Sequence, residues 1–299
     1  MSALPSDISA GPADALAAPG FARTLLRRLR GDPLGLLGFA LVLLVLFCAV
    51  FGPSISPYSP FKLQVSDRFH EPALDHLFGT DNLGRDVFSR VLSGSRIALG
   101  VGGGSIAIAL TLGLVLGLIA GYGPRWLDNF LLLLFDSVYS FPTIMLGLTV
   151  MTLVGPSIGT LVFVIVVIQT PTYARLIRTA TLSIKTCEYV LAVRSLGSSP
   201  ARILLVHILP NIIGPLFIIA SMDIPSVIAL EAGLTYLGMG IPPPAPSWGR
   251  ILQEGFDSIR DAPWIVIAGG VPLIITTLGF TFLGEALRDW LDPRLRRII

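Results

Sequence analysis

The sequence predicts an all-α integral membrane protein with six transmembrane helices and with both termini in the cytoplasm. Of its 299 residues, 53% are hydrophobic and 13% are charged, and the mean hydropathy is +0.78. This composition excludes an ordinary soluble globular fold. Six apolar stretches are long enough to cross roughly 30 Å of hydrocarbon at about 1.5 Å per helical residue. They cover residues 34–52, 97–122, 128–154, 158–177, 207–239 and 264–287.

Arginines set the predicted orientation. Cytoplasmic flanks of membrane spans carry an excess of Lys and Arg, and four arginines precede the first stretch, so we expect a cytoplasmic N-terminus. Six crossings return the chain to the same side, where four more arginines follow. Residues 53–96 and 240–263 then lie on the extracytoplasmic side; the reversed topology is the alternative. The arginines are Arg23, Arg27, Arg28, Arg30, Arg288, Arg294, Arg296 and Arg297.

One partly polar segment, residues 188–210, interrupts the apolar sequence with a helix–break–helix pattern. Good helix formers continue to Leu196, and Gly197 stands where a helix end favours a left-handed residue. Ser199 is a helix-capping residue, and Pro200 suits the first position of a second short helix. Neighbouring basic residues place the segment on the cytoplasmic side. We expect a rigid helical projection that docks on a soluble partner; a mere connector is the alternative.

Glycines recur every four residues in the second stretch, at Gly113, Gly117 and Gly121. Small residues at this spacing let another helix approach closely inside a membrane. We expect them to pack within this chain rather than at a subunit interface.

Several kinds of chemistry are missing from the sequence. Neither lysine, Lys62 or Lys185, follows a glycine, so no phosphate-binding GxxxxGK[ST] loop is present. The three histidines have no metal-ligand spacing, and no paired carboxylates suggest hydrolysis. Cys48 and Cys187 are expected to stay unpaired, since one falls in a span and the other in the cytoplasmic projection. We therefore expect a non-enzyme with no cofactor of its own. The net charge of +2 gives no argument for nucleic acid.

Two carboxylates lie deep in the apolar stretches. An ionisable side chain in hydrocarbon is costly and usually faces a partner or a water-filled path. Asp136 and Glu231 are therefore candidates for the transport pathway or for a subunit interface. A local structural pairing is the equal alternative for each.

Longer motifs resemble the permease subunits of bacterial ABC importers, in the dipeptide/oligopeptide branch and of its "C" type. LFGTDNLGRDVFSRVLSGSR (77–96), EAGLTYLGMGIPPPAPSWGRIL (231–252) and LRDWLDPRLR (287–296) are similar to signatures of that branch. The segment 188–210 resembles the EAA loop of such permeases, with Leu191 in place of the usual glutamate and Val193 in place of the second alanine.

The resemblance implies an inner-membrane subunit that works with other chains. These are a second permease, two cytoplasmic ATPases that bind ATP–Mg, and an extracytoplasmic solute-binding protein. Docking on the ATPases would fall to Glu188, Tyr189, Ala192, Arg194, Gly197, Ser199, Pro200, Arg202 and Pro210. Asp81, Arg85 and Asp86 would form an extracytoplasmic gate or a contact with the binding protein, unless they only pair among themselves.

The resulting division of the chain has four parts. Residues 1–30 form a disordered cytoplasmic tail, and 31–96 hold the first span and an extracytoplasmic segment. Residues 97–290 form the permease domain, with a coupling loop at 184–207 between the fourth and fifth spans. Residues 291–299 form a cytoplasmic tail.

The motifs identify the substrate less specifically than they identify the family. Peptides are the expected cargo, whereas nickel, glutathione or another small solute would fit the same architecture. A six-helix secondary transporter is an alternative of a different class, but it would predict inverted repeats, and none is evident. A membrane scaffold would not need so many glycine-rich and kinked spans.

Overall fold

A computed structural model describes residues 32–291, and these are almost entirely helical. Within that range the only β pairing is a single bridge between Thr80 and Asp86. The predicted tail at 1–30 lies outside the described residues, as does the predicted tail at 291–299 except for Leu291, which ends α11. The long helices are α2 (Pro33–Ile55), α3 (Val87–Tyr122), α4 (Arg125–Tyr139), α5 (Thr143–Val154), α6 (Ile158–Ile184), α9 (Leu209–Tyr236) and α11 (Trp264–Leu291). The short ones are η2 (Val65–Asp67), α7 (Glu188–Ser195), α8 (Pro200–Arg202), the π-helix η3 (Ile203–Ile208) and α10 (Trp248–Asp257).

Five of these helices are long and apolar enough to cross a membrane, and a bent pair provides the sixth crossing if it counts as one span. That pair is α4 and α5, which meet at 85°. The span predicted at 128–154 is thus two helices with a bend between them. Its helix breaks at Ser140–Pro142, because Pro142 has no N–H to donate and its ring disfavours a helical Phe141.

Helix α3 begins well before the apolar stretch that predicted it. Asp86 caps its first turn by accepting from the Ser89 amide, 2.8 Å away. The capped turn brings Arg90 and Arg96 onto a helix whose apolar part begins near residue 97. The charged start of α3 is thus a polar extension of the second span.

Helices α3 and α6 share the most extensive contact in the bundle. A Cβ on Gly113 would lie 2.6 Å from Tyr173 Cβ, and one on Gly117 would lie 2.6 Å from the Ala174 carbonyl oxygen. Gly121 faces Thr181 at 2.7 Å in the same way. The expectation that these glycines pack within the chain is confirmed. They let α3 pack closely against α6, which contributes Ile165, Tyr173 and Ile177 to the core.

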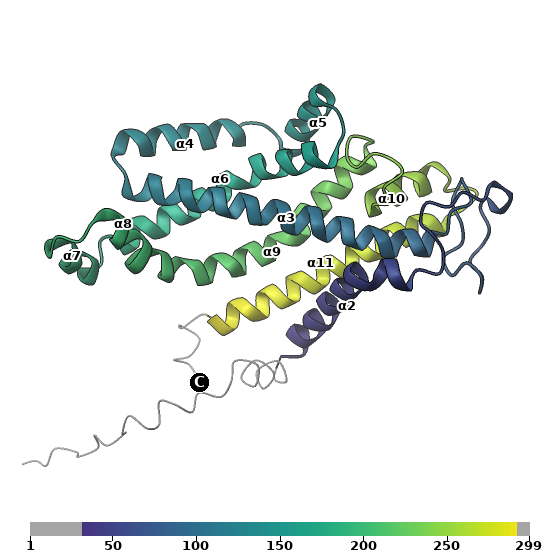
Figure 1. Cartoon of the computed structure of the whole chain (residues 1–299), viewed down its shortest axis with the longest axis horizontal. Coiled ribbons are helices and arrows are strands. Elements are labelled where there is room, and N and C mark those ends of the chain that lie inside the picture. Colours follow the sequence, from purple (N-terminus) through teal and green to yellow (C-terminus); the bar gives the residue numbers. More distant parts are fainter. Residues whose placement is uncertain (1–31, 292–299) are drawn as a thin grey trace, which may run out of the picture.

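The helices lie roughly side by side in an elongated bundle with two different ends (Figure 1). Helices α7 and α8 project at one end, which we call the α7 end. Helix α10 and residues 56–86, here named the α2–α3 segment, lie at the opposite end, the α10 end. The start of α2 and the last turns of α11 both point toward the α7 end.

Candidate functional site

The projection at the α7 end is fixed by local hydrogen bonds. Gly197 has φ of +83° and ends α7, as its sequence position predicted. The Gly197 amide donates to the Arg194 carbonyl oxygen at 3.0 Å, and the Ser198 amide donates to the Val193 carbonyl oxygen at 3.4 Å. These two bonds form a Schellman motif, which satisfies carbonyls that a helix end leaves free. Ser199 Oγ then accepts from the Arg202 amide at 3.4 Å and caps the next helix.

The sequence predicted a short second helix, but in the structure this helix is the start of a long one. Helix α8 continues through η3 into α9, so that residues 200–236 form one helical run. Pro210 explains the π-helix: it has no amide hydrogen, and its ring crowds the carbonyl one turn earlier, so the turn widens. Helix α6 ends at Ile184, and the separate helix α7 begins at Glu188.

A few buried side chains attach the projection to the bundle, and the rest of its surface is open. Val190 is 2% exposed and joins the main core together with Ile203 and Ile208. In contrast, Leu196 is 85% exposed, and Leu191 and Leu205 are also open. The nine residues predicted for docking are all exposed: Glu188, Tyr189, Ala192, Arg194, Gly197, Ser199, Pro200, Arg202 and Pro210. The open leucines were not predicted, although their place beside the charged residues was visible in the sequence.

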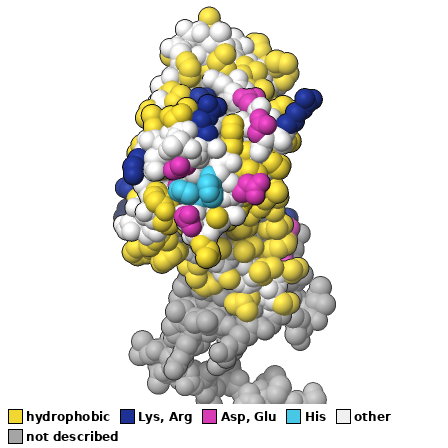
Figure 2. All heavy atoms as spheres, turned by 90° about the vertical axis from the view of Figure 1, so that its right-hand side faces the viewer, with side chains coloured by type: hydrophobic (Ala, Val, Ile, Leu, Met, Phe, Trp, Pro, Cys, Tyr) yellow, Lys and Arg dark blue, Asp and Glu magenta, His cyan; other side chains and the backbone are white. Residues whose placement is uncertain are grey.

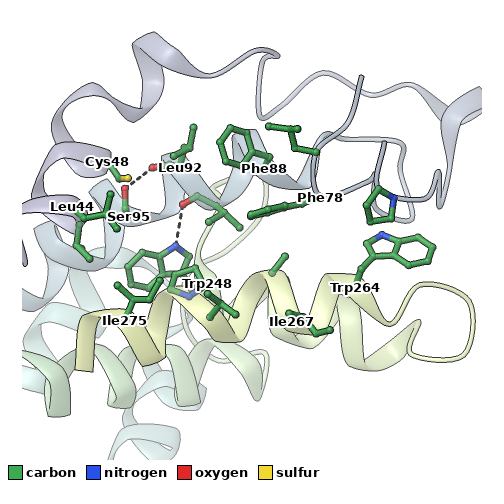
Figure 3. Close-up of a pocket in the computed structure, with 17 residues that line it drawn as sticks. Leu44, Cys48, Phe78, Phe88, Leu92, Ser95, Trp248, Trp264, Ile267 and Ile275 are labelled. Carbon is green, nitrogen blue, oxygen red and sulfur yellow. Dashed lines mark hydrogen bonds between the residues drawn. The ribbon is translucent and has the colours of Figure 1, made fainter. Parts of the chain in front are cut away.

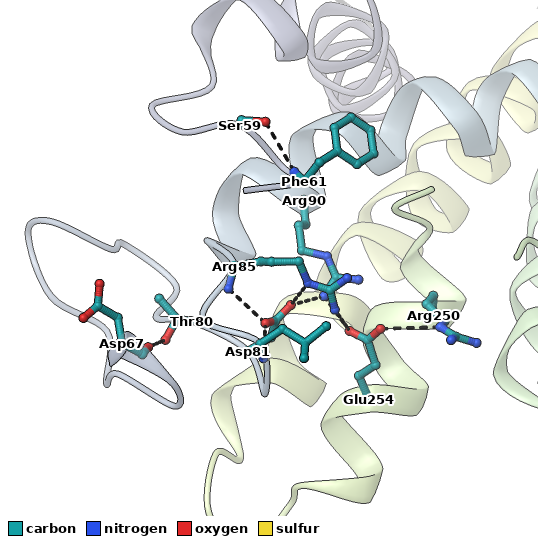
Figure 4. Close-up of polar contacts among 10 residues, drawn as sticks. Ser59, Phe61, Asp67, Thr80, Asp81, Arg85, Arg90, Arg250 and Glu254 are labelled. Carbon is teal, nitrogen blue, oxygen red and sulfur yellow. Dashed lines mark hydrogen bonds and ion pairs between the residues drawn. The ribbon is translucent and has the colours of Figure 1, made fainter. Parts of the chain in front are cut away.

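At the α10 end, three arginines and two carboxylates form a largely buried network, at whose edge Arg250 Nε lies 3.4 Å from Glu254 Oε1 (Figure 4). Arg85 Nε donates to Asp81 Oδ2 at 2.7 Å, and its Nη2 reaches Glu254 Oε2 at 3.1 Å. Arg90 Nη1 contacts the same two carboxylates. Asp81 and Arg90 are 0% and 1% exposed. The network thus fastens the α2–α3 segment and the start of α3 to α10.

Asp86 belongs to a neighbouring contact rather than to this network. It caps α3 and pairs with His76 Nδ1 at 2.8 Å. Figure 2 looks onto this end, where histidine side chains lie among acidic ones. Asp81, Arg85 and Asp86 are all buried, so their side chains are not available at the surface in this conformation. The gate or binding-protein role predicted for them remains a prediction.

Electrostatics hold Glu254 ionised. Burial by itself would raise the pKa of this carboxyl, but the guanidinium groups of Arg90 and Arg85 outweigh it and lower the pKa below its usual value. Sequence reasoning missed both Arg90 and Glu254. Arg90 stood in the same motif as Asp81, whereas Glu254 lies 164 residues after Arg90 and gave no local signal.

The two deep carboxylates have opposite environments. Asp136 on α4 forms an ion pair with Arg175 on α6, and both side chains are exposed, at 65% and 38%. The Arg175 guanidinium also lies 4.5 Å from the centre of the Tyr139 ring. Glu231, by contrast, is 0% exposed; its Oε1 accepts from Thr235 Oγ1 at 2.9 Å, and its Oε2 has no partner among the described residues.

A partly polar cavity of about 300 Å³ lies near the Asp136–Arg175 pair, between the α4–α5 bend, α6 and α9. Tyr139 belongs both to the pair and to the cavity wall. Gln169 of α6 and Ser226 of α9 add further polar groups to the wall. Its lining residues are Tyr139, Thr143, Ile168, Gln169, Ser226, Val227 and Leu230.

Comparisons with known proteins agree with the motifs. The family model described as "Binding-protein-dependent transport system inner membrane component" matches residues 113–297. A second one, "N-terminal TM domain of oligopeptide transport permease C", matches residues 20–72.

Two similar proteins are named for different solutes. The dipeptide transport system permease protein DppC of Alkalihalophilus pseudofirmus is 34% identical over 292 residues, which are 98% of this chain and 96% of the relative. The glutathione transport system permease protein GsiD of Pectobacterium atrosepticum is 36% identical over 256 residues, 85% of each chain. Among solved structures, a chain of the MetNI methionine ABC transporter in inward facing conformations has a TM-score of 0.55 and 18% identity. It covers 68% of this chain and 97% of its own length, and this likeness shows the fold alone.

Proposed function

Since this chain belongs to the family of binding-protein-dependent transport system inner membrane components, we propose that it is the permease subunit of an ATP-driven importer that moves peptides into the cytoplasm. It is a multi-pass protein of the bacterial inner membrane. The peptide cargo follows the dipeptide and oligopeptide permeases among its relatives. ATP–Mg binds to partner subunits, and this chain contributes no catalytic group.

The observation that carries the proposal is the projection at the α7 end. It combines a locked helix end at Gly197 with an exposed surface that is both apolar and basic. A membrane subunit without its own phosphate-binding loop needs such an element to receive force from an ATPase, and short helices seated in a groove of the partner provide it. Because α8, η3 and α9 form one helical run, movement at residue 200 passes directly into a span.

The proposed orientation places the α7 end in the cytoplasm. Lys185, Arg194 and Arg202 lie at or near this end, in agreement with the excess of basic residues expected there. The α2–α3 segment and α10 then face outward, where the solute-binding protein docks. The network of Asp81, Arg85, Arg90 and Glu254 acts there by holding the segment rigid.

The transport pathway follows the face that carries the Asp136–Arg175 pair. An exposed ion pair on two spanning helices would be costly against lipid, so it faces either water in the pathway or the second permease. The neighbouring cavity offers amide and hydroxyl groups that can hydrogen-bond a peptide backbone. Glu231 is enclosed within the chain, and we therefore place Asp136, not Glu231, on the pathway.

The nature of the solute is the finer part of the proposal. A glutathione permease is among the relatives, and glutathione is itself a modified peptide, so it is the second candidate cargo. Nickel and other small solutes are less favoured. Family membership disfavours a six-helix secondary transporter, and nothing in the chain suggests a nucleic-acid partner.

Uptake into proteoliposomes tests the proposal. The complete transporter, assembled with its second permease, both ATPases and the binding protein, would be supplied with ATP inside and a labelled dipeptide, tripeptide or glutathione outside. We expect ATP-dependent accumulation of the short peptides and none when the ATPases are omitted. Accumulation driven by an ion gradient without ATP would overturn the proposal.

A further inference from the structure

An apolar cavity of about 400 Å³ lies near the α10 end of the bundle and shares no lining residue with the polar cavity described above. Its walls come from α2, α3 and α11, and Trp248 of α10 forms part of its base (Figure 3). Pro72, Leu77 and Phe78 of the α2–α3 segment close it toward the outside. In the orientation proposed above, the cavity therefore occupies the outer half of the membrane, between the first and last spans.

Glycines explain why the cavity exists. A Cβ on Gly38 would lie 2.5 Å from the Leu283 amide nitrogen, so α2 touches α11 directly toward the α7 end. Near its other end α2 has shifted onto α3, where a Cβ on Gly52 would lie 2.8 Å from the Leu92 carbonyl oxygen. Helices α2 and α11 thus diverge toward the outside, and the wedge between them is the cavity.

The lining offers little to a polar ligand or to water; at its outer end the Trp264 Nε1–H is a buried donor with no partner among the described residues. Ser95 Oγ already donates to the Leu92 carbonyl oxygen at 2.6 Å, and Trp248 Nε1 donates to the Val91 carbonyl oxygen at 3.0 Å. A buried water needs two to four polar partners, so this cavity would be dry. An empty apolar cavity is also unfavourable, because its lining atoms lose dispersion contacts. An apolar occupant is therefore favoured.

The mouth opens onto surface that meets lipid. Leu44 of α2 is 48% exposed, and Ile267 and Val271 of α11 are 64% and 43% exposed. Hydrophobic side chains cover the flank of the molecule below the polar end (Figure 2). A helix of a partner subunit does not fit, because one turn of a helix about 10 Å across already fills roughly 400 Å³. A single hydrocarbon chain fits both the volume and the setting.

We propose that this cavity binds one acyl chain of a phospholipid from the outer leaflet of the membrane. The chain enters between Leu44 and Val271 and packs against Leu92 and Trp248. It packs between α2 and α11, both of which line the cavity. The headgroup stays in the outer interface, near the Trp264 ring at the cavity's outer end.

Photo-crosslinking tests the site in the assembled transporter. The probe is phosphatidylcholine with a diazirine near the methyl end of one acyl chain, diluted into vesicles of unlabelled phosphatidylcholine. Trp248, Leu92 and Ala268 are 1%, 6% and 6% exposed, so bulk lipid does not reach them. We expect mass spectrometry to find adducts on these buried residues. Adducts confined to exposed positions such as Leu43 and Val50 would overturn the proposal.

Two variants on the same helix sharpen the test. Cys48→Phe places a ring inside the cavity and should remove most adducts on Trp248 and Leu92. Leu46→Phe, at a position on α2 outside the lining, should leave them unchanged. If Cys48→Phe does not assemble, Ile267→Trp narrows the mouth from an exposed position and should have the same effect. Equal labelling in the blocking and control variants would contradict an acyl chain in this cavity.

Discussion

Lys185 donates from its Nζ to the carbonyl oxygen of Gly121, 2.7 Å away. Lys185 follows the last residue of α6, and Gly121 lies in the last turn of α3. The bond brings a positive charge to a helix C-terminus, where free carbonyls and the helix dipole favour it. It also ties the base of the α7 projection to the second span. The projection is therefore attached to the bundle on both of its sides, by Lys185 before α7 and by the continuous helix after it.

Removing the Lys185 contact should loosen the projection without unfolding the bundle. Lys185→Met keeps most of the side-chain volume but loses the charged hydrogen bond, a loss of about 1–2 kcal/mol at this half-buried position. Hydrogen exchange should become faster at the α7 amides and stay unchanged in α3. Lys62→Met removes the other lysine of the chain, at an exposed position, and is the control. Equal exchange in both variants would show that the contact has no such role.

Gly197 offers a way to separate backbone strain from surface charge. Asn and Asp both tolerate a left-handed backbone better than other side chains, and no atom lies within 4 Å of a Cβ at Gly197. Gly197→Asn should therefore keep most ATP hydrolysis stimulated by the loaded binding protein. Gly197→Asp should lose most of it, because a negative charge enters a basic docking surface. Similar activity of the two variants would mean that this position does not touch the ATPase.

Backbone strain has its own variant at the same residue. Gly197→Val puts a β-branched side chain at φ +83° and should cost about 1–2 kcal/mol of local stability. The Schellman bonds should weaken, and the variant should assemble yet hydrolyse ATP without transporting. If the variant still transported peptide at the wild-type ratio of ATP hydrolysed to peptide moved, the projection would not need a rigid helix end at Gly197.

The buried network predicts a pH dependence through Glu254. Its pKa is lowered in the folded state, so it stabilises the fold above its ordinary pKa of about 4.5, and this stabilisation is lost as pH falls below that value. Glu254→Gln should cost about 2–3 kcal/mol at pH 7, because Arg90 and Arg85 then share one carboxylate. Between pH 7 and pH 3.5, the melting temperature should change less in the variant than in the wild type. Glu71→Gln, at an exposed position, should follow the wild type throughout.

The Asp136–Arg175 pair can be tested by exchanging its charges. If the pair only joins α4 to α6, the double variant Asp136→Arg with Arg175→Asp should transport normally. We expect the double variant to assemble like the wild type, but its peptide uptake to stay roughly fivefold or more below that of the wild type, because the charges face the pathway. Asp128 and Arg178 form a second, less exposed pair between the same helices, and their exchange is the structural control. Full uptake by the exchanged Asp136–Arg175 variant would remove the pair from the pathway.

Local chemistry made much of the fold readable in advance. Apolar length located the spans, and the residue types at Gly197 and Ser199 predicted a helix end and a cap that the structure contains. The same reasoning should have found the bend, since Pro142 stands inside the third apolar stretch. A count of hydrophobic residues hides such a break, because proline barely lowers the apolar content of a long window.

Contacts between distant segments could not be predicted in the same way. Nothing near Arg90 in the sequence points to Glu254, and the wedge between α2 and α11 depends on where two glycine contacts fall in three dimensions. Burial separated Asp136 from Glu231 for a similar reason: both are carboxylates in apolar stretches, and only the packing of α9 encloses one of them. Periodicity gives the faces of a helix but not its neighbours.

Placing a photo-crosslinking amino acid at each end of the bundle tests the central claim most directly. Leu196 is 85% exposed at the α7 end, and Leu74 is 94% exposed at the α10 end, so neither replacement disturbs a contact. In intact cells that contain the whole transporter, we expect the group at Leu196 to crosslink to the ATPase, and the group at Leu74 never to do so. Crosslinks from Leu74 to the ATPase, or none from Leu196 in an active transporter, would contradict both the orientation and the docking role of the projection.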